Sequence, residues 1–417
     1  MSSWSLLLLF LQLVFIISDN HDCGVHDALK YVVNSNDAVC IDGSDPVYYL
    51  RRSAANSLNY LVFFEGGGWC YDLAQCYIRS SNFLGSSKNY PMCLKQRHLS
   101  HYLDNNRDNN PTFFDWNIAY VKYCDGGSYS SDASARFNGK KLFFKGKNIR
   151  TAIITHLLRN NSMSNAKSIV LAGCSAGGLG VLLSVDDLST LIRATNPTIN
   201  VRGFVDSGIF ADFKGGVERN HVSLLNKLYK NDSANWFDND ILDYGGAMRN
   251  VFSFMNISAG TNKRCIKSTN NPSNCIFAEH LIPNIVTPIF FSQSKYDYWS
   301  LYHIVGNIHD HNLLTEFSTK VKNIMLNLVN QNPLNGLFMN SCTHHCTKCA
   351  NRAADDNLWH SKNKLVASNS SAVQYTIANA VASWLQNKYS YFVQDEVYPC
   401  TNCCSCKLSL LSQYHTV

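Results

Sequence analysis

The chain has 417 residues, of which 46% are hydrophobic and 16% charged, and its formal net charge is +6. This length and composition, with no low-complexity tract and no fixed-period repeat, indicate a globular protein with a large core. Lysine and arginine are scattered along the sequence, so the modest positive charge gives no support to a nucleic-acid partner.

The N-terminus contains an apolar run, LLLLFLQLVFII at residues 6–17. It is shorter than the roughly 18 residues that a membrane span needs, and it has the position of the apolar region of a secretory signal peptide. We therefore expect residues 1–18 to be cleaved, and residues 19–417 to form one secreted domain with no stable membrane insertion. Four N-x-S/T sequons fit secretion and are candidate glycosylation sites: Asn160, Asn231, Asn256 and Asn369.

Short apolar runs alternate with segments of helical spacing along the chain. The runs, which predict buried strands, lie at 58–64, 117–123, 168–172, 201–206, 287–293 and 336–341. The predicted helices lie at 147–160, 178–195, 318–331 and 372–389. This alternation predicts parallel βαβ units and hence an α/β fold in three layers, with a mostly parallel central sheet. The least regular stretches are 76–116, 125–145 and 211–280.

The first of two glycine-rich motifs is LVFFEGGGWC at 61–70. A predicted strand ends at Glu65, and the three glycines that follow let the main chain approach a ligand closely, as an oxyanion loop does in α/β-hydrolases. Their spacing matches neither of the common nucleotide-binding loops. Glu65 itself is either a general base or, as we favour, a carboxylate that accepts hydrogen bonds from the amides of its own loop.

The second motif is SIVLAGCSAGGLG at 168–180, in which G-x-S-x-G follows a strand and begins a helix. That is the context of a nucleophile elbow, with Ser175 at its apex and the Ala176 N–H facing a developing oxyanion. The amides of Gly67, Gly68 and Ala176 are the candidates for the oxyanion hole. The alternative is an ordinary tight strand–helix turn with a buried serine.

Cys174 stands next to Ser175 and is a rival nucleophile by residue type. It lies one position before the apex, so its side chain should point back into the sheet. A buried thiol or a disulfide partner is the interpretation we favour, because a nucleophilic cysteine also needs neighbours that stabilise a thiolate.

A nucleophilic serine needs a base and an orienting acid, which follow in the order Ser, Asp or Glu, His in this fold class. Asp297 comes just after the predicted strand at 287–293. The last predicted strand is followed by CTHHCTKC at 342–349, which offers His344 and His345. The order therefore holds, with two histidines available for the base.

All sixteen cysteines follow the apolar N-terminal run. In an oxidising compartment such a set indicates disulfides, which would staple the long loops and the C-terminal tail after Tyr398. The alternative is zinc, because Cys346-x-x-Cys349 and Cys400-x-x-Cys403 have ligand-like spacing. The signal peptide favours cross-links, and we expect no metal.

Seven stretches in this order resemble the pectin acetylesterase family, which also contains the Notum carboxylesterases. They are YLVFFEGGGWC, GSSKNYP, FFDWNIAYVKYCDG, VLAGCSAGGLG, DSGIF, SQSKYDYW and NSCTHHC. The resemblance implies an α/β-hydrolase-like fold and a Ser–Asp–His triad that cleaves esters without metal or cofactor. Matched by motif, Ser175 is the nucleophile, Asp297 the acid and His345, the histidine of S-C-x-x-H-C, the base. His344 occupies a variable position and receives no role.

The resemblance leaves two substrates open. One is acetylated pectin or a related cell-wall polysaccharide, and the other is a lipidated secreted protein, as for Notum. Gly68 and Ile209 stand where Notum-type sequences have tryptophans, which favours the polysaccharide. Four aromatics could stack on sugars or fill the core: Tyr129, Tyr296, Tyr298 and Trp299. A catalytically silent binding protein and a zinc-stabilised interaction module are the alternatives from other classes. We expect a monomer that is extracellular, in the cell wall for the first substrate.

Overall fold

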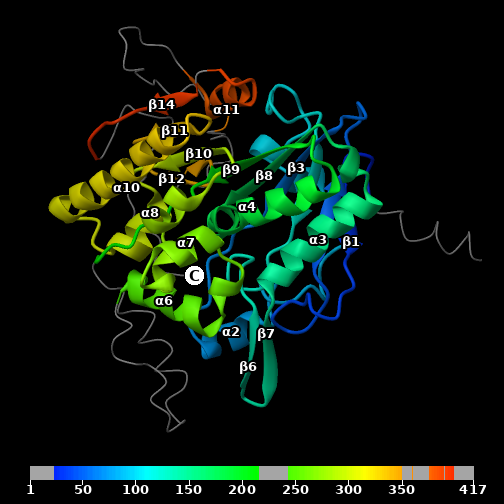
Figure 1. The fold of residues 1–417 in the computed structure, drawn as a ribbon, viewed down its shortest axis with the longest axis horizontal. Helices are drawn as coiled ribbons and strands as arrows, with labels where there is room; N and C mark the ends of the chain where they lie inside the picture. Colours follow the sequence, from blue (N-terminus) through cyan, green and yellow to red (C-terminus); the bar gives the residue numbers. More distant parts are fainter. Residues whose placement is uncertain (1–22, 216–242, 350–358, 360–374, 389, 399–417) are drawn as a thin grey trace, which may run out of the picture.

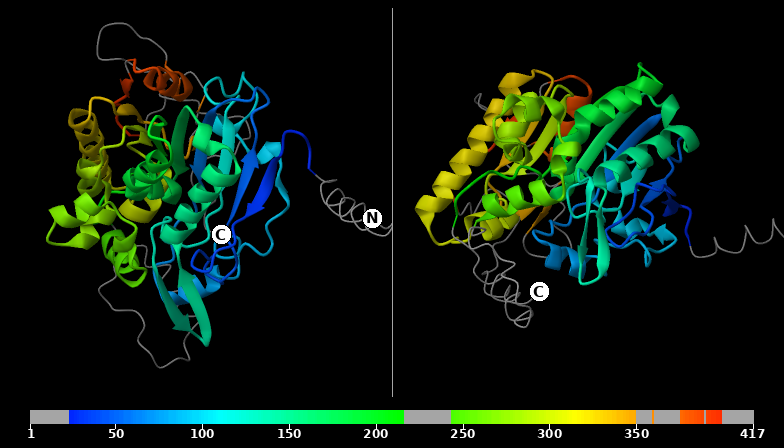
Figure 2. Two further views of the ribbon diagram at one scale, coloured as in Figure 1. Left: turned by 45° about the vertical axis from the view of Figure 1, so that its right-hand side comes forward. Right: turned by 60° about the horizontal axis from the view of Figure 1, so that its bottom comes forward.

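A ten-stranded sheet forms the centre of the protein, for which a computed structural model describes residues 23–215, 243–349, 359, 375–388 and 390–398. Its strands follow the order β14 (Tyr391–Val393), β11 (Gly336–Asn340), β10 (Ile289–Ser294), β9 (Asn200–Asp206), β8 (Ser168–Cys174), β3 (Asn59–Phe64), β5 (Asn117–Val121), β2 (Val47–Arg51), β1 (Ala28–Val32) and β4 (Cys93–Leu94). All pairings from β14 to β5 are parallel, whereas β2, β1 and β4 pair antiparallel at the other end (Figure 2).

Helices cover both faces of this sheet. One face packs against α3 (Gly146–Asn160), α4 (Ala176–Thr195) and α10 (His311–Gln331), which lie in front of the strands in Figure 1. The other face packs against α11 (Ile377–Leu385) and aromatic side chains of the 99–116 segment. The predicted three-layer α/β fold with a mostly parallel sheet is therefore confirmed.

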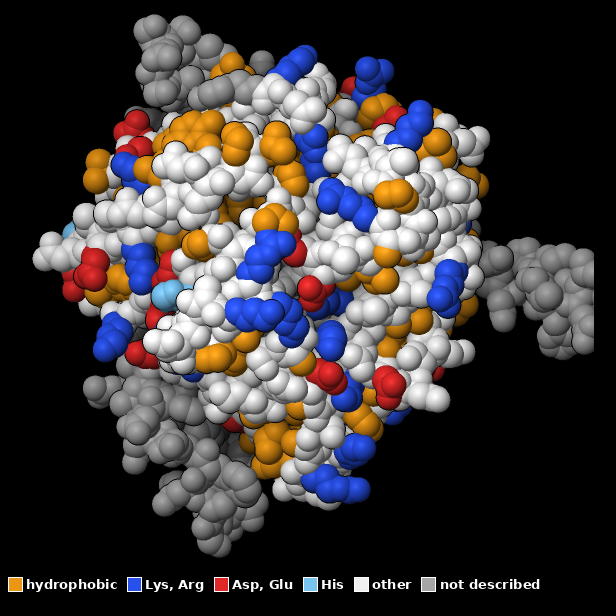
Figure 3. All heavy atoms as spheres, in the orientation of Figure 1, with side chains coloured by type: hydrophobic (Ala, Val, Ile, Leu, Met, Phe, Trp, Pro, Cys, Tyr) orange, Lys and Arg blue, Asp and Glu red, His pale blue; other side chains and the backbone are white. Residues whose placement is uncertain are grey.

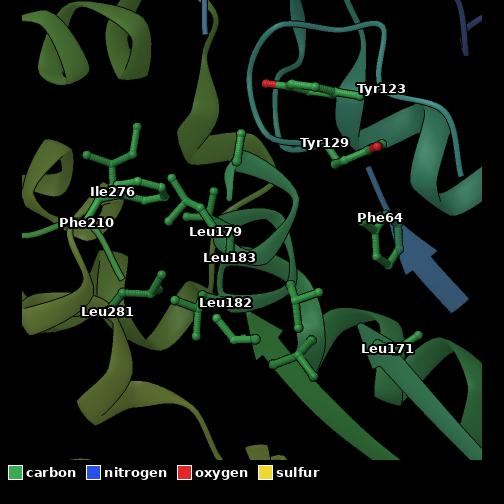
Figure 4. Close-up of a cluster of buried hydrophobic side chains, with 14 of the residues drawn as sticks. Phe64, Tyr123, Tyr129, Leu171, Leu179, Leu182, Leu183, Phe210, Ile276 and Leu281 are labelled. Atoms are coloured by element: carbon green, nitrogen blue, oxygen red, sulfur yellow. The ribbon is translucent and has the colours of Figure 1, made fainter. Parts of the chain in front are cut away.

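The two buried faces explain why the strand sequences are continuously apolar. In β8, Ile169 and Leu171 belong to the core under α4, while Val170 and Ala172 belong to the core under α11. Figure 4 shows how leucines of α4, among them Leu179, interdigitate with side chains from more distant segments. A strand with two dry faces needs apolar residues at every position.

The ends of two helices differ from the predictions because of their caps. Helix α10 starts seven residues earlier than predicted, since the Asp310 side chain accepts hydrogen bonds from two amides of the first turn. Helix α11 is shorter than predicted and starts after Thr376, whose hydroxyl accepts from the Asn379 amide. The further helices are α2 (Leu73–Arg79), α6 (Tyr244–Phe254), α7 (Lys263–Ser268), α8 (Ala278–Leu281) and α9 (Tyr298–Ser300).

The 125–145 stretch was expected to be irregular, and that expectation is wrong. It contains a β-hairpin of β6 (Ala133–Phe137) and β7 (Lys140–Phe144). The connecting residues Asn138 and Gly139 have φ values of 47° and 73°. Asn-Gly with two positive φ angles is the preferred two-residue hairpin turn, so the signal was present in the sequence.

Disulfides staple the loops, as predicted. The pairs in which both cysteines lie within the described residues include Cys23–Cys93, Cys40–Cys124, Cys70–Cys76, Cys174–Cys346 and Cys265–Cys275. Because the sulfur of Cys346 is bonded to Cys174, it is not a thiolate ligand, and the zinc interpretation of Cys346-x-x-Cys349 is wrong. The other ligand-like pair, Cys400-x-x-Cys403, lies outside the described residues.

Two of the four sequons fall within the described residues, and both asparagines are exposed. Asn160 is the last residue of α3, and Asn256 follows α6 with a positive φ of 51°. Asn231, Asn369 and residues 1–18 lie outside the described ranges. No helix in the described part of the chain is both long and apolar enough to span a bilayer. The face in Figure 3 carries lysines and arginines interspersed with acidic and neutral side chains.

Candidate active site

Ser175 lies at the turn between the carboxyl end of β8 and the start of α4. Its φ of 57° and ψ of −128° are strained for a residue with a side chain, as in a nucleophile elbow. The flanking glycines are required by space: a Cβ on Gly173 would lie 2.3 Å from the Gly177 carbonyl oxygen, and one on Gly177 would lie 2.1 Å from that of Phe64. The turn therefore brings β8, α4 and β3 into contact around the serine.

The glycine loop after β3 lies directly against this turn. A Cβ on Gly66 would be 2.6 Å from the Cys174 carbonyl oxygen and 3.0 Å from the Ser175 Cβ. Gly67 and Gly68 both have positive φ, and their carbonyl oxygens accept hydrogen bonds from the Arg79 guanidinium at 2.9 Å and the Tyr123 hydroxyl at 2.8 Å. Within the described residues, no protein group accepts a hydrogen bond from the amides of Gly67 and Gly68.

Asp297 and His345 form a hydrogen-bonded pair. The His345 Nδ1 lies 2.6 Å from the Asp297 Oδ2, and the other carboxylate oxygen accepts from the Ser300 amide at 2.9 Å. Asp297 is 1% exposed and His345 8% exposed, comparable to the 7% of Ser175. With Nδ1 held by a carboxylate, Nε2 is the nitrogen that can accept a proton from another group.

The Cys174–Cys346 disulfide connects the two halves of this region. It joins the residue before Ser175 to the residue after His345, with a Cα–Cα distance of 5.5 Å. Cys174 is thus a disulfide partner, one of the two roles favoured from the sequence, and not a free thiol. Cys346 and Thr347 form the turn between β12 (His344–His345) and β13 (Lys348–Cys349), each with a φ of 56°. The disulfide and a 2.9 Å hydrogen bond from the Cys346 amide to the Ser207 hydroxyl hold this unusual turn in place.

Glu65 does not bond to the amides of its own loop, so that part of the prediction is wrong. Its carboxylate accepts from the Lys122 ammonium at 2.5 Å, the Tyr120 hydroxyl at 3.2 Å and the Tyr123 amide at 2.9 Å. These donors lie at the carboxyl end of β5. The carboxylate therefore ties the end of β3 to the end of β5, which positions the glycine loop.

The neighbouring His344 is fully buried and has its Nε2 against the Asn340 amide group. Burial lowers the pKa of His344 to about 4. It is therefore neutral near pH 7 and packs behind the site. Of the four aromatics offered for sugar stacking, Tyr129 and Tyr296 are buried in the core, while Tyr298 and Trp299 are half-buried.

The structure adds one acidic residue that the sequence analysis did not single out. Asp206, at the carboxyl end of β9, is fully buried and accepts hydrogen bonds from the Tyr102 hydroxyl and the Ser207 hydroxyl, both at 3.2 Å. Its carbonyl oxygen accepts from the Ser175 amide at 3.0 Å. Burial raises the pKa of Asp206 from 3.8 to about 7, against the opposing effect of His345. The signal was its position in DSG at a strand end.

Asp206→Asn should change how stability depends on pH. The folded protein keeps a proton on Asp206 between about pH 4 and 7 that the unfolded chain has lost, so this residue makes the free energy of unfolding fall as pH rises through that window. The loss is at most about 1.4 kcal/mol per pH unit. The free energy of unfolding is measured with denaturant at pH 5 and pH 8. Relative to wild type, the variant should be more stable at pH 8 than it is at pH 5. An equal difference between variant and wild type at the two pH values would contradict the raised pKa of Asp206.

Comparisons with known proteins extend over nearly the whole chain. A family model described as pectinacetylesterase matches residues 24–405. Pectin acetylesterase 5 of Arabidopsis thaliana is 30% identical over 402 residues, covering 90% of this chain and 84% of that protein. Pectin acetylesterase 4 of the same plant is 29% identical over 390 residues, covering 88% and 85%. The palmitoleoyl-protein carboxylesterase NOTUM of Mus musculus is 30% identical over 292 residues, covering 68% of this chain and 52% of that protein.

These matches agree with the three-layer α/β fold described above. The chain belongs to the pectinacetylesterase family and is a carboxylic ester hydrolase.

Proposed function

We propose that the protein is a secreted serine esterase that removes acetyl groups from pectin or a related cell-wall polysaccharide. The mature enzyme comprises residues 19–417 as one catalytic domain, acts as a monomer and uses no metal or cofactor. The observation that carries the proposal is the elbow at Ser175, joined through the Cys174–Cys346 disulfide to the hairpin that bears His345, the partner of Asp297.

In the proposed mechanism, the His345 Nε2 takes the proton of the Ser175 hydroxyl as its oxygen attacks the ester carbonyl carbon. Asp297 holds the imidazole orientation and stabilises the imidazolium. The tetrahedral oxyanion receives hydrogen bonds from the amides of Gly67, Gly68 and Ala176. As the bond between the acyl carbon and the sugar oxygen breaks, His345 gives the proton to that oxygen, and the sugar leaves with a free hydroxyl. Water, activated by the same histidine, attacks the acetyl-enzyme, and acetate leaves with Ser175 regenerated.

A cluster of aromatic rings next to the site supports a short acyl group. Trp299 lies beside His345, with ring centroids 6.3 Å apart. Trp69, Phe210 and Trp299 pack mutually, at centroid distances of 5.1 Å, 5.1 Å and 5.6 Å. Rings at this spacing are in van der Waals contact, so a hydrocarbon chain cannot pass between them. A deacylase for long acyl chains needs an open apolar channel. Here the three packed rings occupy that space.

Acyl-chain selectivity tests the proposal. We expect kcat/KM for p-nitrophenyl acetate to exceed that for the octanoate at least about tenfold, because the packed rings exclude the longer chain. Trp69→Ala should shift the ratio toward octanoate by opening space. Trp384→Ala, which removes a similarly buried indole on the opposite face of the sheet, should leave the ratio unchanged. A wild-type preference for octanoate would replace acetyl removal with Notum-like deacylation.

A further inference from the structure

A pocket of about 850 Å³ lies beside the glycine loop and does not include the candidate triad. It is lined by Glu65, Tyr120 and Lys122 at the ends of β3 and β5, and by the 91–98 segment on its other side. Its volume lies in the range of natural small-molecule sites. Neither the candidate triad nor the acyl-group argument uses this pocket.

The pocket wall is rich in cationic side chains. Lys95, Arg97 and Lys122 line it together with His98, against one carboxylate, that of Glu65. That carboxylate is occupied by three donors, the nearest being the Lys122 ammonium at 2.5 Å. A carboxylate so fully bonded does not attract a cation, and the pocket is therefore suited to an anion.

Arg97 is the cation best placed to bind a ligand. Lys122 is paired with Glu65, and Lys95 lies 3.3 Å from the Asp27 carboxylate. Arg97 is exposed, and its Nε contacts the His98 ring at 3.4 Å. Among the described residues, no protein acceptor engages the two terminal nitrogens of Arg97. A guanidinium edge of this kind matches a carboxylate in a bidentate fashion.

The chain connects this pocket to the nucleophile over a short path. Glu65 lines the pocket, and the next residue, Gly66, packs against Ser175. A polymer whose acetyl ester reaches Ser175 can therefore place another part of its chain in the pocket. Tyr120 also lines the pocket, and aromatic residues are of the kind on which sugar rings pack.

We propose that this pocket is a subsite for an acidic sugar, in which Arg97 binds the carboxylate of a uronate unit of the polymer that carries the reacting ester. The inference rests on the proposed function and deepens it, because it assigns the binding of an acidic unit of the polymer to Arg97 and this pocket. Lys122 and Lys95 are already paired with Glu65 and Asp27, so the charge that binds the carboxylate comes from Arg97.

Arg97→Gln tests the subsite through substrate comparison. The KM for acetylated polygalacturonate should rise roughly 5- to 20-fold, because a charge-assisted hydrogen bond is lost. The values for p-nitrophenyl acetate and for acetylated xylan, a neutral polymer, should stay at wild-type levels. Arg97→Lys, which keeps the charge but not the fork, should give an intermediate KM. The difference between wild type and R97Q should shrink at about 0.5 M salt, where charges on the surface are screened.

A matched control is Arg193→Gln. Arg193 is also exposed, but it lies in the last turn of α4, away from the carboxyl end of the strands. R193Q should behave as wild type on all three substrates. The proposal is overturned if R97Q keeps a KM for acetylated polygalacturonate within twofold of R193Q. It is also overturned if the KM of R97Q for acetylated xylan rises by as much as its KM for acetylated polygalacturonate. The effect would then not depend on a carboxylate.

A binding experiment separates the subsite from the proposed esterase function. Ser175→Ala and Ser175→Ala/Arg97→Gln proteins are titrated calorimetrically with unacetylated polygalacturonate oligosaccharides. The Arg97 change should raise the dissociation constant by roughly the same 5- to 20-fold factor as the KM. Equal affinities of the two proteins would overturn the subsite. If wild type released no acetate from either polymer, the proposed function would fail, while this titration would still decide on the subsite.

Discussion

Replacing Ser175 with alanine is expected to lower kcat for ester hydrolysis by roughly 10⁴- to 10⁶-fold, since the acyl-enzyme can no longer form. The residual rate would come from the oxyanion donors and from substrate positioning alone. Ser175 is only 7% exposed and makes a tight turn, yet removal of its hydroxyl leaves the backbone amide bonded to Asp206. Folding and binding of an acetylated oligosaccharide should therefore be retained, as calorimetry can measure.

Ser184→Ala provides the matched control on the same helix. Ser184 is 2% exposed and donates its hydroxyl proton to the Gly180 carbonyl oxygen at 2.6 Å, within α4. Its loss removes a buried hydroxyl without touching the elbow, so kcat should stay within about twofold of wild type. Wild-type turnover of p-nitrophenyl acetate by the S175A protein would refute the assignment of the nucleophile.

The second large effect should follow from replacing both Cys174 and Cys346 with alanine. The disulfide closes a loop with a sequence separation of 172, and its removal should lower the free energy of unfolding by roughly 2–5 kcal/mol. We further expect a loss in kcat of about 10²-fold in protein that is still folded, because a displacement of 1 Å in a catalytic group has that consequence. Without the bond, the strained turn at Cys346 and Thr347 can relax and move His345.

The Cys265–Cys275 disulfide allows a control for the effect of removing a cross-link as such. It has a sequence separation of 10 and lies in the α7 region, so its double alanine variant should lose less stability and keep the wild-type kcat. Urea denaturation and steady-state kinetics on both variants provide the comparison. Equal kcat values in the two variants would show that the Cys174–Cys346 bond has no role in positioning the site.

The central sheet could be predicted because its physics is local. A strand buried on both faces needs an uninterrupted apolar run, and six such runs correspond to β3, β5, β8, β9, β10 and β11. The fully buried β2 was missed although its sequence, VYYLR, is apolar enough. β1, ALKYV, is partly exposed at the antiparallel end of the sheet and has a weaker pattern. Only tertiary pairing places these strands in the sheet, β2 next to β5 and β1 next to β2.

The site could be predicted in part, for a related reason. Ser175 and its flanking glycines are contiguous, so spacing alone indicated the elbow. The partners of Glu65 are 55 to 58 residues away, on β5 and just beyond it, and no local pattern contains them. The partner of Cys174 among fifteen other cysteines was likewise beyond reach, because pairing depends on which loops the sheet brings together. Asp206 required knowing that Tyr102 covers it.

The 172-residue separation between Cys174 and Cys346 also affects when their disulfide can form. During synthesis the segment with Ser175 emerges long before the hairpin with His345, and the bond between Cys174 and Cys346 can form only after both cysteines are present under oxidising conditions. On the proposed mechanism, a chain that still lacks this bond should hydrolyse esters about 10²-fold more slowly than the oxidised enzyme. Full hydrolytic activity would then follow the oxidation of the chain.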